Sequence, residues 1–400
     1  MKKVILCFSL IFLFLYSISA NPSFAEQKFD TYLVTFKNEV DSKIILNHGG
    51  TIEKTYKYTP TIVSKIPVDS IDSLRENPNI STIEKDVSVE VIPDIKKEYL
   101  QKHSSSMYTG APVLSDWNME RVKVFPVHNQ GYKGSNIKIG IIDSGIDITH
   151  EDLKVTDGIN IIDPNSNYND DYGHGTRVAG VISALDNNKG VLGMAPLSEI
   201  YAIKVLDARG KGSISNVISG IEWAIDNKLD IVNLSLQTII NNNALEEVVK
   251  KAYEQGIILV AAAGNKGHNG VQETITYPAA YKEVISVGAI DENNEKVIFS
   301  SVGSRLDLVA PGNNVYTTIP RSFYYVYSGT SIASPHVAGI AALLKEANPN
   351  LTNIEISQIL KDTATDLKDN FYYGNGLVNA EKALLEIQKM KKNEKNEKNG

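Results

Sequence analysis

From residue 137 onward, short apolar segments alternate with segments of helical periodicity, and this alternation constrains the fold more than any other feature. The apolar segments cover residues 137–142, 200–205, 231–236, 257–262 and 284–287. Uninterrupted apolar strands are buried on both faces, as in a parallel sheet with helices on either side. Helix-like segments at residues 216–227 and 244–255 can supply this cover. The sequence therefore predicts an α/β fold with a doubly wound, mostly parallel sheet flanked by helices.

Residues 1–25 have the pattern of a secretory signal peptide. Two lysines precede an apolar run at residues 4–18, and small residues follow, so we expect cleavage after Ala20 or Ala25. The alternative, an uncleaved membrane anchor, needs about 20 apolar residues, and this run is shorter. The only cysteine, Cys7, lies in the removed segment. We therefore predict a secreted, extracellular protein with no stable membrane anchor, no disulfide and no thiol nucleophile.

The rest of the chain divides into four parts. Residues 26–92 mix strand-like and helix-like runs and predict a small α+β domain, while residues 93–111 are typical of an exposed linker. The larger α/β domain covers residues 112–388, and the Lys/Asn/Glu-rich residues 389–400 predict a disordered charged tail. Because the formal net charge is −7, we expect neither nucleic acid nor an anionic membrane as a partner.

Four polar residues at strand ends or helix starts have the side chains that acyl transfer requires. Asp143 ends an apolar strand, His174 lies between glycines, and Ser331 begins an apolar helix. An aspartate can orient a histidine, which takes the proton of an attacking serine hydroxyl. Asn265, after another strand, is suited to donate a hydrogen bond to the developing oxyanion. Each residue alone could be a turn, a buried ring or a helix cap, but the four in this order favour a catalytic triad with an oxyanion hole.

Three sequence segments surround these residues. Asp143 lies in D-S-G-I-D, His174 in G-H-G-T-R-V-A-G, and Ser331 in G-T-S-I-A-S-P-H-V-A-G. The segments resemble the three signature segments of the subtilisin-like serine proteases, the subtilase family, and the similarity spans about residues 117–385. The resemblance implies that the small domain at residues 26–92 is an inhibitor-type propeptide, which assists folding and temporarily inhibits the enzyme. It also implies that the precursor cuts itself in the linker.

The resemblance further implies a structural calcium site and no catalytic cofactor. The segment L-D-N-N-K-G-V at residues 185–191 is similar to the strong calcium-binding loop of the family, and oxygen ligands suit a hard cation. The implied ligands are Asp152, the side chain of Asn187 and the carbonyl groups of Leu185, Lys189 and Val191. The alternative is an ordinary Asn-rich turn, and the absence of the glutamine expected near Val113 adds weight to it.

Substrates of the family bind as an added strand between two strand edges. The residues matching these edges and the primary specificity pocket are Gly210, Gly212, Ser235, Leu236, Gln237, Gly264 and Lys266. Gln237 stands where a glycine is common and is expected to narrow the groove. Lys266 stands where broad subtilisins often carry an acidic residue, so we expect a preference for an acidic residue before the scissile bond and self-cleavage after Glu98. The alternative is a Lys266 side chain that points to solvent.

These features predict a secreted serine endopeptidase of restricted specificity, which resembles the leader peptidases that mature lantibiotics and related bacteriocins. Two alternatives stay open: a broad degradative extracellular subtilisin, and an inactive subtilase scaffold that binds peptides. The expected partners are a peptide or precursor-protein substrate and the chain's own propeptide, and we expect a monomer. His336, in the helix that Ser331 begins, is interpreted as a packed structural residue.

Overall fold

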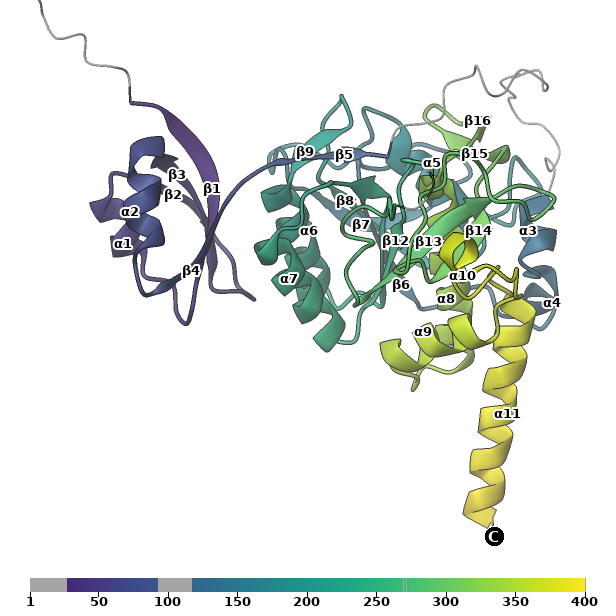
Figure 1. The fold of residues 1–400 in the computed structure, drawn as a ribbon. Coiled ribbons are helices and arrows are strands. Elements are labelled where there is room, and N and C mark those ends of the chain that lie inside the picture. The colour runs from purple at the N-terminus through teal and green to yellow at the C-terminus, as the bar shows by residue number, and fades with distance from the viewer. Residues whose placement is uncertain (1–26, 93–116, 269, 271, 400) are drawn as a thin grey trace, which may run out of the picture.

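The computed structural model describes residues 27–92, 117–268, 270 and 272–399 (Figure 1). A large α/β body is joined to a small N-terminal unit through an extended strand. The predicted signal peptide at residues 1–25, the predicted cut after Glu98 and the position of Val113 lie outside the described residues. In the part of the chain that is described, none of the helices combines the length and the apolar character needed to cross a bilayer.

A seven-stranded sheet forms the centre of the large body, in the order β14-β13-β12-β10-β6-β8-β7, and its neighbouring strands all run parallel. Its strands are β6 (Lys138–Asp143), β7 (Val155–Asn160), β8 (Glu199–Lys204), β10 (Ile231–Leu234), β12 (Ile258–Ala262), β13 (Val284–Ile290) and β14 (Leu308–Pro311). Strands are added first on one side of β6 and, from β10 on, on its other side, so the switch point lies between β6 and β10. The predicted doubly wound fold is confirmed.

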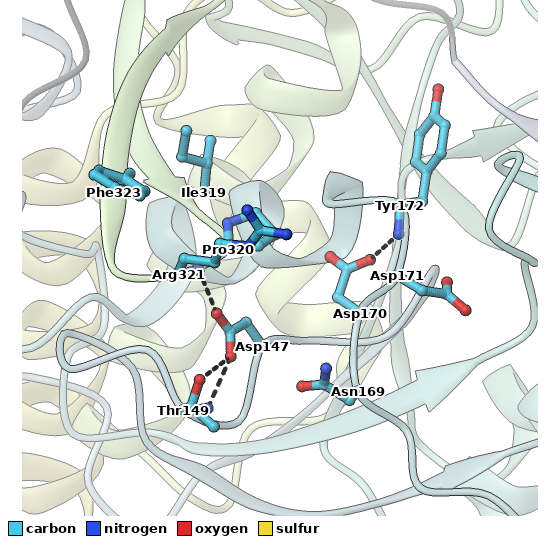
Figure 2. Close-up of a pocket in the computed structure, with 10 residues that line it drawn as sticks. All are labelled: Asp147, Thr149, Asn169, Asp170, Asp171, Tyr172, Ile319, Pro320, Arg321 and Phe323. Carbon is cyan, nitrogen blue, oxygen red and sulfur yellow. Dashed lines mark hydrogen bonds between the residues drawn. The ribbon is translucent and has the colours of Figure 1, made fainter.

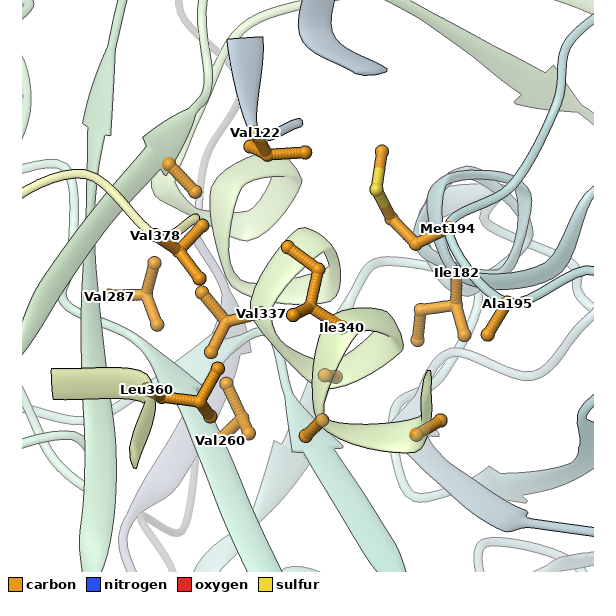
Figure 3. Close-up of a cluster of buried hydrophobic side chains, with 14 of the residues drawn as sticks. Val122, Ile182, Met194, Ala195, Val260, Val287, Val337, Ile340, Leu360 and Val378 are labelled. Atoms are coloured by element: carbon orange, nitrogen blue, oxygen red, sulfur yellow. The ribbon is translucent and has the colours of Figure 1, made fainter. Parts of the chain in front are cut away.

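Helices cover both faces of this sheet because its strands are apolar on both faces. In β12, Val260 belongs to one buried cluster, while Leu259 and Ala261 belong to the cluster on the opposite face. Figure 3 shows Val337 and Ile340 of the central helix in the first cluster. The helices of the large body are α3 (Trp117–Arg121), α4 (Phe125–His128), α5 (His174–Ser183), α6 (Ile214–Asp226), α7 (Asn243–Glu254), α8 (Thr330–Ala347), α9 (Asn353–Asp362), α10 (Asn370–Tyr373) and α11 (Ala380–Asn399).

The small unit is a four-stranded antiparallel sheet, in the order β2-β3-β1-β4, packed against short helices. Its elements are β1 (Phe29–Phe36), α1 (Ser42–Asn47), β2 (Thr51–Thr55), β3 (Thr61–Pro67), the 3-10 turn Val68–Ser70, α2 (Ile71–Arg75) and β4 (Ile80–Lys85). Its own buried cluster includes Phe36, Ile45 and Leu74. The next strand, β5 (Ser88–Val91), leaves this unit and pairs with strands of the large body.

The prediction of a disordered tail at residues 389–400 is wrong for the described residues up to Asn399, which continue helix α11. The first turns of α11 are anchored in the core, where Leu384 and Ile387 are buried. Lysine and glutamate have high helix propensity, so the charged continuation prolongs a helix that packing has already started. Lys391 Nζ also donates a hydrogen bond of 2.5 Å to the carbonyl oxygen of Ala347.

Candidate active site

Asp143 and His174 meet at the carboxyl edge of the sheet. Asp143 is the last residue of β6, and His174 is the first residue of α5. The His174 Nδ1 atom lies 2.9 Å from each oxygen of the Asp143 carboxylate, and both side chains are buried. Nδ1 therefore donates its hydrogen to the carboxylate, which leaves Nε2 as the proton acceptor of the ring.

Ser331 is the second residue of α8, the helix that packs against α5. Its hydroxyl oxygen and the Nε2 atom of His174 are both buried, and neither has a hydrogen-bond partner among the described residues. Buried polar atoms without partners are unfavourable and uncommon in folded proteins, so they need a functional or structural explanation. Nucleophilic attack requires a hydroxyl group as the nucleophile and a basic nitrogen that accepts its proton. Ser331 and His174 supply these two groups.

Asn265 follows β12 and is held by the first turn of α8. Its Oδ1 atom accepts hydrogen bonds of 3.0 Å from the backbone nitrogen and the hydroxyl of Thr330. A β-carbon at Gly329 would lie 3.0 Å from Ser331 Oγ and 3.3 Å from Asn265 Nδ2. The serine hydroxyl and the asparagine amide therefore border one small space, which the glycine leaves open.

Asp170 organises this region, and the sequence analysis did not identify it. One of its carboxylate oxygens accepts from the nitrogen of Gly173 at 2.7 Å and the hydroxyl of Ser144 at 2.9 Å. The other oxygen accepts from the nitrogen and hydroxyl of Thr176, at 2.9 and 2.6 Å. Burial raises the pKa of Asp170, although these hydrogen bonds act against that change. Asp170 thus joins the residue after Asp143 to the first turn of α5; an acidic residue shortly before G-H-G-T is its only signal in the sequence.

The predicted substrate edges flank a strand of the chain itself. β5 lies between β9 (Lys211–Ser213) and β11 (Leu236–Gln237) and is antiparallel to both. The pairs are Ser88 with Ser213, Val89 with Gly212, Glu90 with both Lys211 and Gln237, and Val91 with Leu236. The Val91 nitrogen also donates to the Gly210 carbonyl oxygen at 3.0 Å. Four of the predicted groove residues therefore do contact an extended peptide segment.

Of the remaining predicted groove residues, Ser235 and Gly264 lie close to the serine. Ser235 is buried, and its hydroxyl donates to the Ser331 carbonyl oxygen at 3.1 Å. Gly264 has φ of +112°, and a β-carbon there would lie 2.8 Å from the hydroxyl of Thr276, so no side chain fits. The Lys266 side chain is exposed. Thr276 is a further residue of this wall that the sequence analysis did not identify.

A separate cavity of about 570 Å³ lies beside the loop that precedes His174. Figure 2 shows its polar groups bonded to one another: Asp147 accepts from the backbone nitrogen of Arg321 at 2.7 Å and from the hydroxyl of Thr149 at 2.6 Å. None of Asp143, His174 and Ser331 lines this cavity. This cavity is therefore separate from the residues predicted for catalysis.

Comparison with known proteins decides the family. A model of the subtilase family matches residues 134–376, more than half of the chain. The chain belongs to the subtilase family. It is 40% identical over 386 residues to subtilisin NAT of Bacillus subtilis subsp. natto and to subtilisin E of B. subtilis, with 94% of this chain and 96% of each relative covered. It is 52% identical over 262 residues to subtilisin DY of B. licheniformis, covering 66% of this chain and 96% of the relative. The protein is a subtilisin-like serine endopeptidase.

In this subtilase, the implied calcium ligands come together in one loop cluster. Asn187 Nδ2 donates to Asp152 Oδ1 at 2.8 Å, and the Val191 nitrogen lies 3.4 Å from Oδ2. The Leu185 nitrogen donates to the Asp152 carbonyl oxygen at 3.0 Å, whereas the Lys189 side chain is exposed. Asp152 is fully buried, and burial raises its pKa to about 6. Among the described residues, no cluster of three or more acidic, histidine or cysteine side chains is present, so a cation here would rely on carbonyl oxygens.

His336 is a structural residue of this subtilase, in line with its predicted role. Its Nδ1 atom donates to the Ile332 carbonyl oxygen at 2.9 Å, and Nε2 accepts from Asn118 Nδ2 at 3.0 Å. Burial lowers the pKa of His336 from its ordinary value of 6.5 to about 4. The unfolded chain therefore binds a proton below about pH 6.5 that the folded chain binds only near pH 4.

We expect this difference to remove about 3 kcal/mol of stability between pH 7 and pH 4, with the loss beginning as the pH falls below the unfolded value. Urea unfolding of the full-length Ser331→Ala protein measures it without self-digestion. The His336→Gln variant cannot take up the proton. Its free energy of unfolding should therefore fall by about 3 kcal/mol less between pH 7 and pH 4. An unchanged slope in that variant would show that other groups cause the acid sensitivity.

Proposed function

We propose that Ser331, His174 and Asp143 are the nucleophile, the general base and the orienting carboxylate of this endopeptidase. The carrying observation is the His174–Asp143 pair, which leaves Nε2 to accept the proton of the buried Ser331 hydroxyl. The Ser331 oxygen attacks the peptide carbonyl carbon while His174 takes the hydroxyl proton, and His174 then gives that proton to the leaving amine. Water, activated by the same imidazole, releases the acyl group from the serine.

Asn265 is proposed as the oxyanion donor. Its Oδ1 atom accepts two hydrogen bonds from Thr330, which fixes the orientation of the amide. The Nδ2 atom therefore faces the space that Gly329 leaves beside Ser331 Oγ. The Ser331 backbone nitrogen, at the start of α8, is the second donor. Both donors are set before the substrate binds, so they stabilise the negative charge without reorganisation during the reaction.

We propose that residues 26–92 act as a propeptide that inhibits the enzyme until they are removed. Besides β5 in the groove, the small unit presents two carboxylates to helix starts of the large body. Asp86 accepts from the nitrogen and hydroxyl of Ser215 in α6, at 3.0 and 2.7 Å. Glu84 accepts from the nitrogen of Asn243 in α7 at 3.0 Å. Carboxylates at helix N-termini are favourable, and here they join the two units.

The substrate is proposed to be a defined precursor, such as a bacteriocin leader, cut after an acidic residue. Lys266 is exposed directly after Asn265, where its charge can attract a carboxylate, and buried Gln237 lies in β11 beside Thr276. A panel of peptides that differ only before the scissile bond tests this. We expect kcat/KM for glutamate to exceed that for lysine by at least about tenfold, or about 1.4 kcal/mol. Extensive digestion of casein would favour the broad degradative enzyme, and absent labelling by a fluorophosphonate would favour the inactive scaffold.

We also propose that export through the signal peptide delivers the precursor outside the cell, and that calcium stabilises it there. The buried Asp152 carboxylate beside an Asn-rich loop is a suitable anchor for a hard cation, with Asn187 and the carbonyl groups of Leu185, Lys189 and Val191 as further ligands. The cation would have a structural role only.

Removal of calcium should lower the melting temperature of the mature enzyme by about 5 to 10 °C, as expected for a ligand present at about 100 times its Kd. Differential scanning fluorimetry of inhibited enzyme, with and without EDTA, measures this shift. Asp152→Asn should abolish the calcium dependence. Asp186→Asn is the matched control and should retain it, because Asp186 pairs with Lys133 at 2.6 Å instead. A wild-type enzyme indifferent to EDTA would contradict the calcium site.

A further inference from the structure

Strand β5 occupies the groove in one register that leads directly to the nucleophile. Val91 pairs with Leu236, so the next residue, Ile92, is set opposite Ser235. The Ser235 hydroxyl donates to the carbonyl oxygen of Ser331 at 3.1 Å. Ile92 is fully buried at this end of the strand. If this register continues, the bond that a docked β5 would offer to Ser331 is the one that follows Ile92.

Burial fixes this register. Val89, Val91 and Ile92 are buried, whereas Glu90 between them is only partly covered. If the strand slipped forward by one residue, Glu90 would take the buried position of Val89, which is costly for a carboxylate. If it slipped by two residues, proline 93 would take the place of Val91 and the hydrogen bond from the Val91 nitrogen to the Gly210 carbonyl would be lost, because proline has no N–H group.

The residue that follows Ile92 in the sequence is a proline. We propose that Pro93 makes β5 an inhibitor that this enzyme cannot cut in its docked register, so the maturing cut falls elsewhere in the linker. This inference rests on the proposed catalytic function. Inhibition and cleavage would then belong to different segments: β5 blocks the groove, and a later part of the linker is cut.

The chemistry of the cut explains the block. Cleavage would join Ser331 Oγ to the Ile92 carbonyl carbon, break the bond from that carbon to the Pro93 nitrogen, and pass the serine proton through His174 to that nitrogen. The nitrogen must turn its lone pair toward the imidazole before it can accept the proton. In proline the nitrogen belongs to a ring, and the ring also restricts the conformation of the preceding residue. The ring therefore hinders the proton transfer that would release the propeptide.

A cut within the linker requires that β5 first leave the groove and that another segment enter it. Conversion of the wild-type precursor is then limited by release of β5, whereas in the docked register a cleavable bond after Ile92 would be offered to Ser331 without that release. Such preorganisation typically accelerates a reaction by large factors. Replacing the proline should therefore both create a new cut and speed maturation.

The test uses the full-length precursor without its signal peptide, followed by mass spectrometry of the products over time. In wild type we expect new N-termini beyond residue 93 and none at Pro93. In Pro93→Ala we expect a new N-terminus at residue 93 and loss of intact precursor at least about tenfold faster. Because a β-branched residue before the bond can itself slow cleavage, the double variant Ile92→Leu/Pro93→Ala is tested as well. Ile92→Leu alone, which keeps the proline, is the matched control and should stay uncut at this bond.

A wild-type N-terminus at Pro93 would overturn the inference. So would the absence of cleavage after residue 92 in both alanine variants, provided that the same preparations hydrolyse a peptide substrate. If the preparations show neither peptide hydrolysis nor fluorophosphonate labelling, the proposed catalytic function fails together with the inference. Pro112→Ala, which changes a proline of the same region that does not follow β5, should leave the fragment pattern unchanged.

Discussion

Replacement of Ser331 by alanine should lower kcat by about a million-fold, the loss that a subtilisin shows when its nucleophile is removed. The side chain is buried, and its oxygen has no hydrogen-bond partner among the described residues, so the substitution removes the attacking atom without breaking a hydrogen bond within them. Initial rates on a fluorogenic peptide and fluorophosphonate labelling measure the effect after the linker of the Ser331→Ala precursor has been cut by an added metalloprotease. Both signals should disappear.

The matched control is Ser304→Ala, because Ser304 is exposed and its backbone nitrogen donates to Glu273, which is not among the predicted groove residues. It should retain wild-type rates and labelling. Circular dichroism of the Ser331→Ala precursor should match that of the wild-type precursor. Residual labelling of the Ser331→Ala protein at the wild-type level would mean that a different serine is the nucleophile.

The second large effect is expected for Asn265→Asp, with a loss in kcat of about 100- to 1,000-fold, or about 3 to 4 kcal/mol, and little change in KM. The aspartate keeps an oxygen that can accept from Thr330, which Asn265 Oδ1 accepts at 3.0 Å. It replaces the Nδ2 donor by a second acceptor. The change thus removes the proposed oxyanion contact while the fold of the turn is preserved.

Steady-state kinetics with one peptide substrate separate kcat from KM in this variant. Asn293→Asp makes the same chemical change at an exposed position and should have no effect. If Asn265→Asp instead raised KM and left kcat within about tenfold of wild type, the amide would contribute to substrate binding in the ground state and not to the transition state.

The sheet and the placement of the chemical groups could be predicted because both depend on local sequence. The apolar segment at residues 231–236 corresponds to β10 followed by β11. Asp143 ends β6 and Asn265 follows β12, and the carboxyl ends of these two strands lie on one edge of the sheet. In a parallel sheet the residues at the carboxyl ends of the strands lie along one edge, and only β10 separates β12 from β6 here. The distance of 2.9 Å between His174 and Asp143 agrees with that expectation of proximity.

Other features could not be predicted because they depend on contacts between distant segments. The segment around β5 has the pattern of a strand, but an alternating strand pattern does not say which edge it joins, and its partners are Gly212 and Leu236 of the other unit. Asp170 could not be distinguished from a solvated acidic residue until Ser144, Gly173 and Thr176, which donate four hydrogen bonds to it, were placed around it.

By itself, the sequence determined the α/β class, the family and the residue types available for catalysis, because hydrophobic periodicity and short motifs depend only on residues close together in the chain. The tertiary structure alone decided that β5 fills the groove and ends at Val91, directly before Ile92, that Asp170 anchors the start of α5, and that the charged C-terminal residues continue a helix. These outcomes depend on which surfaces are buried together, and burial is a property of the packed chain as a whole.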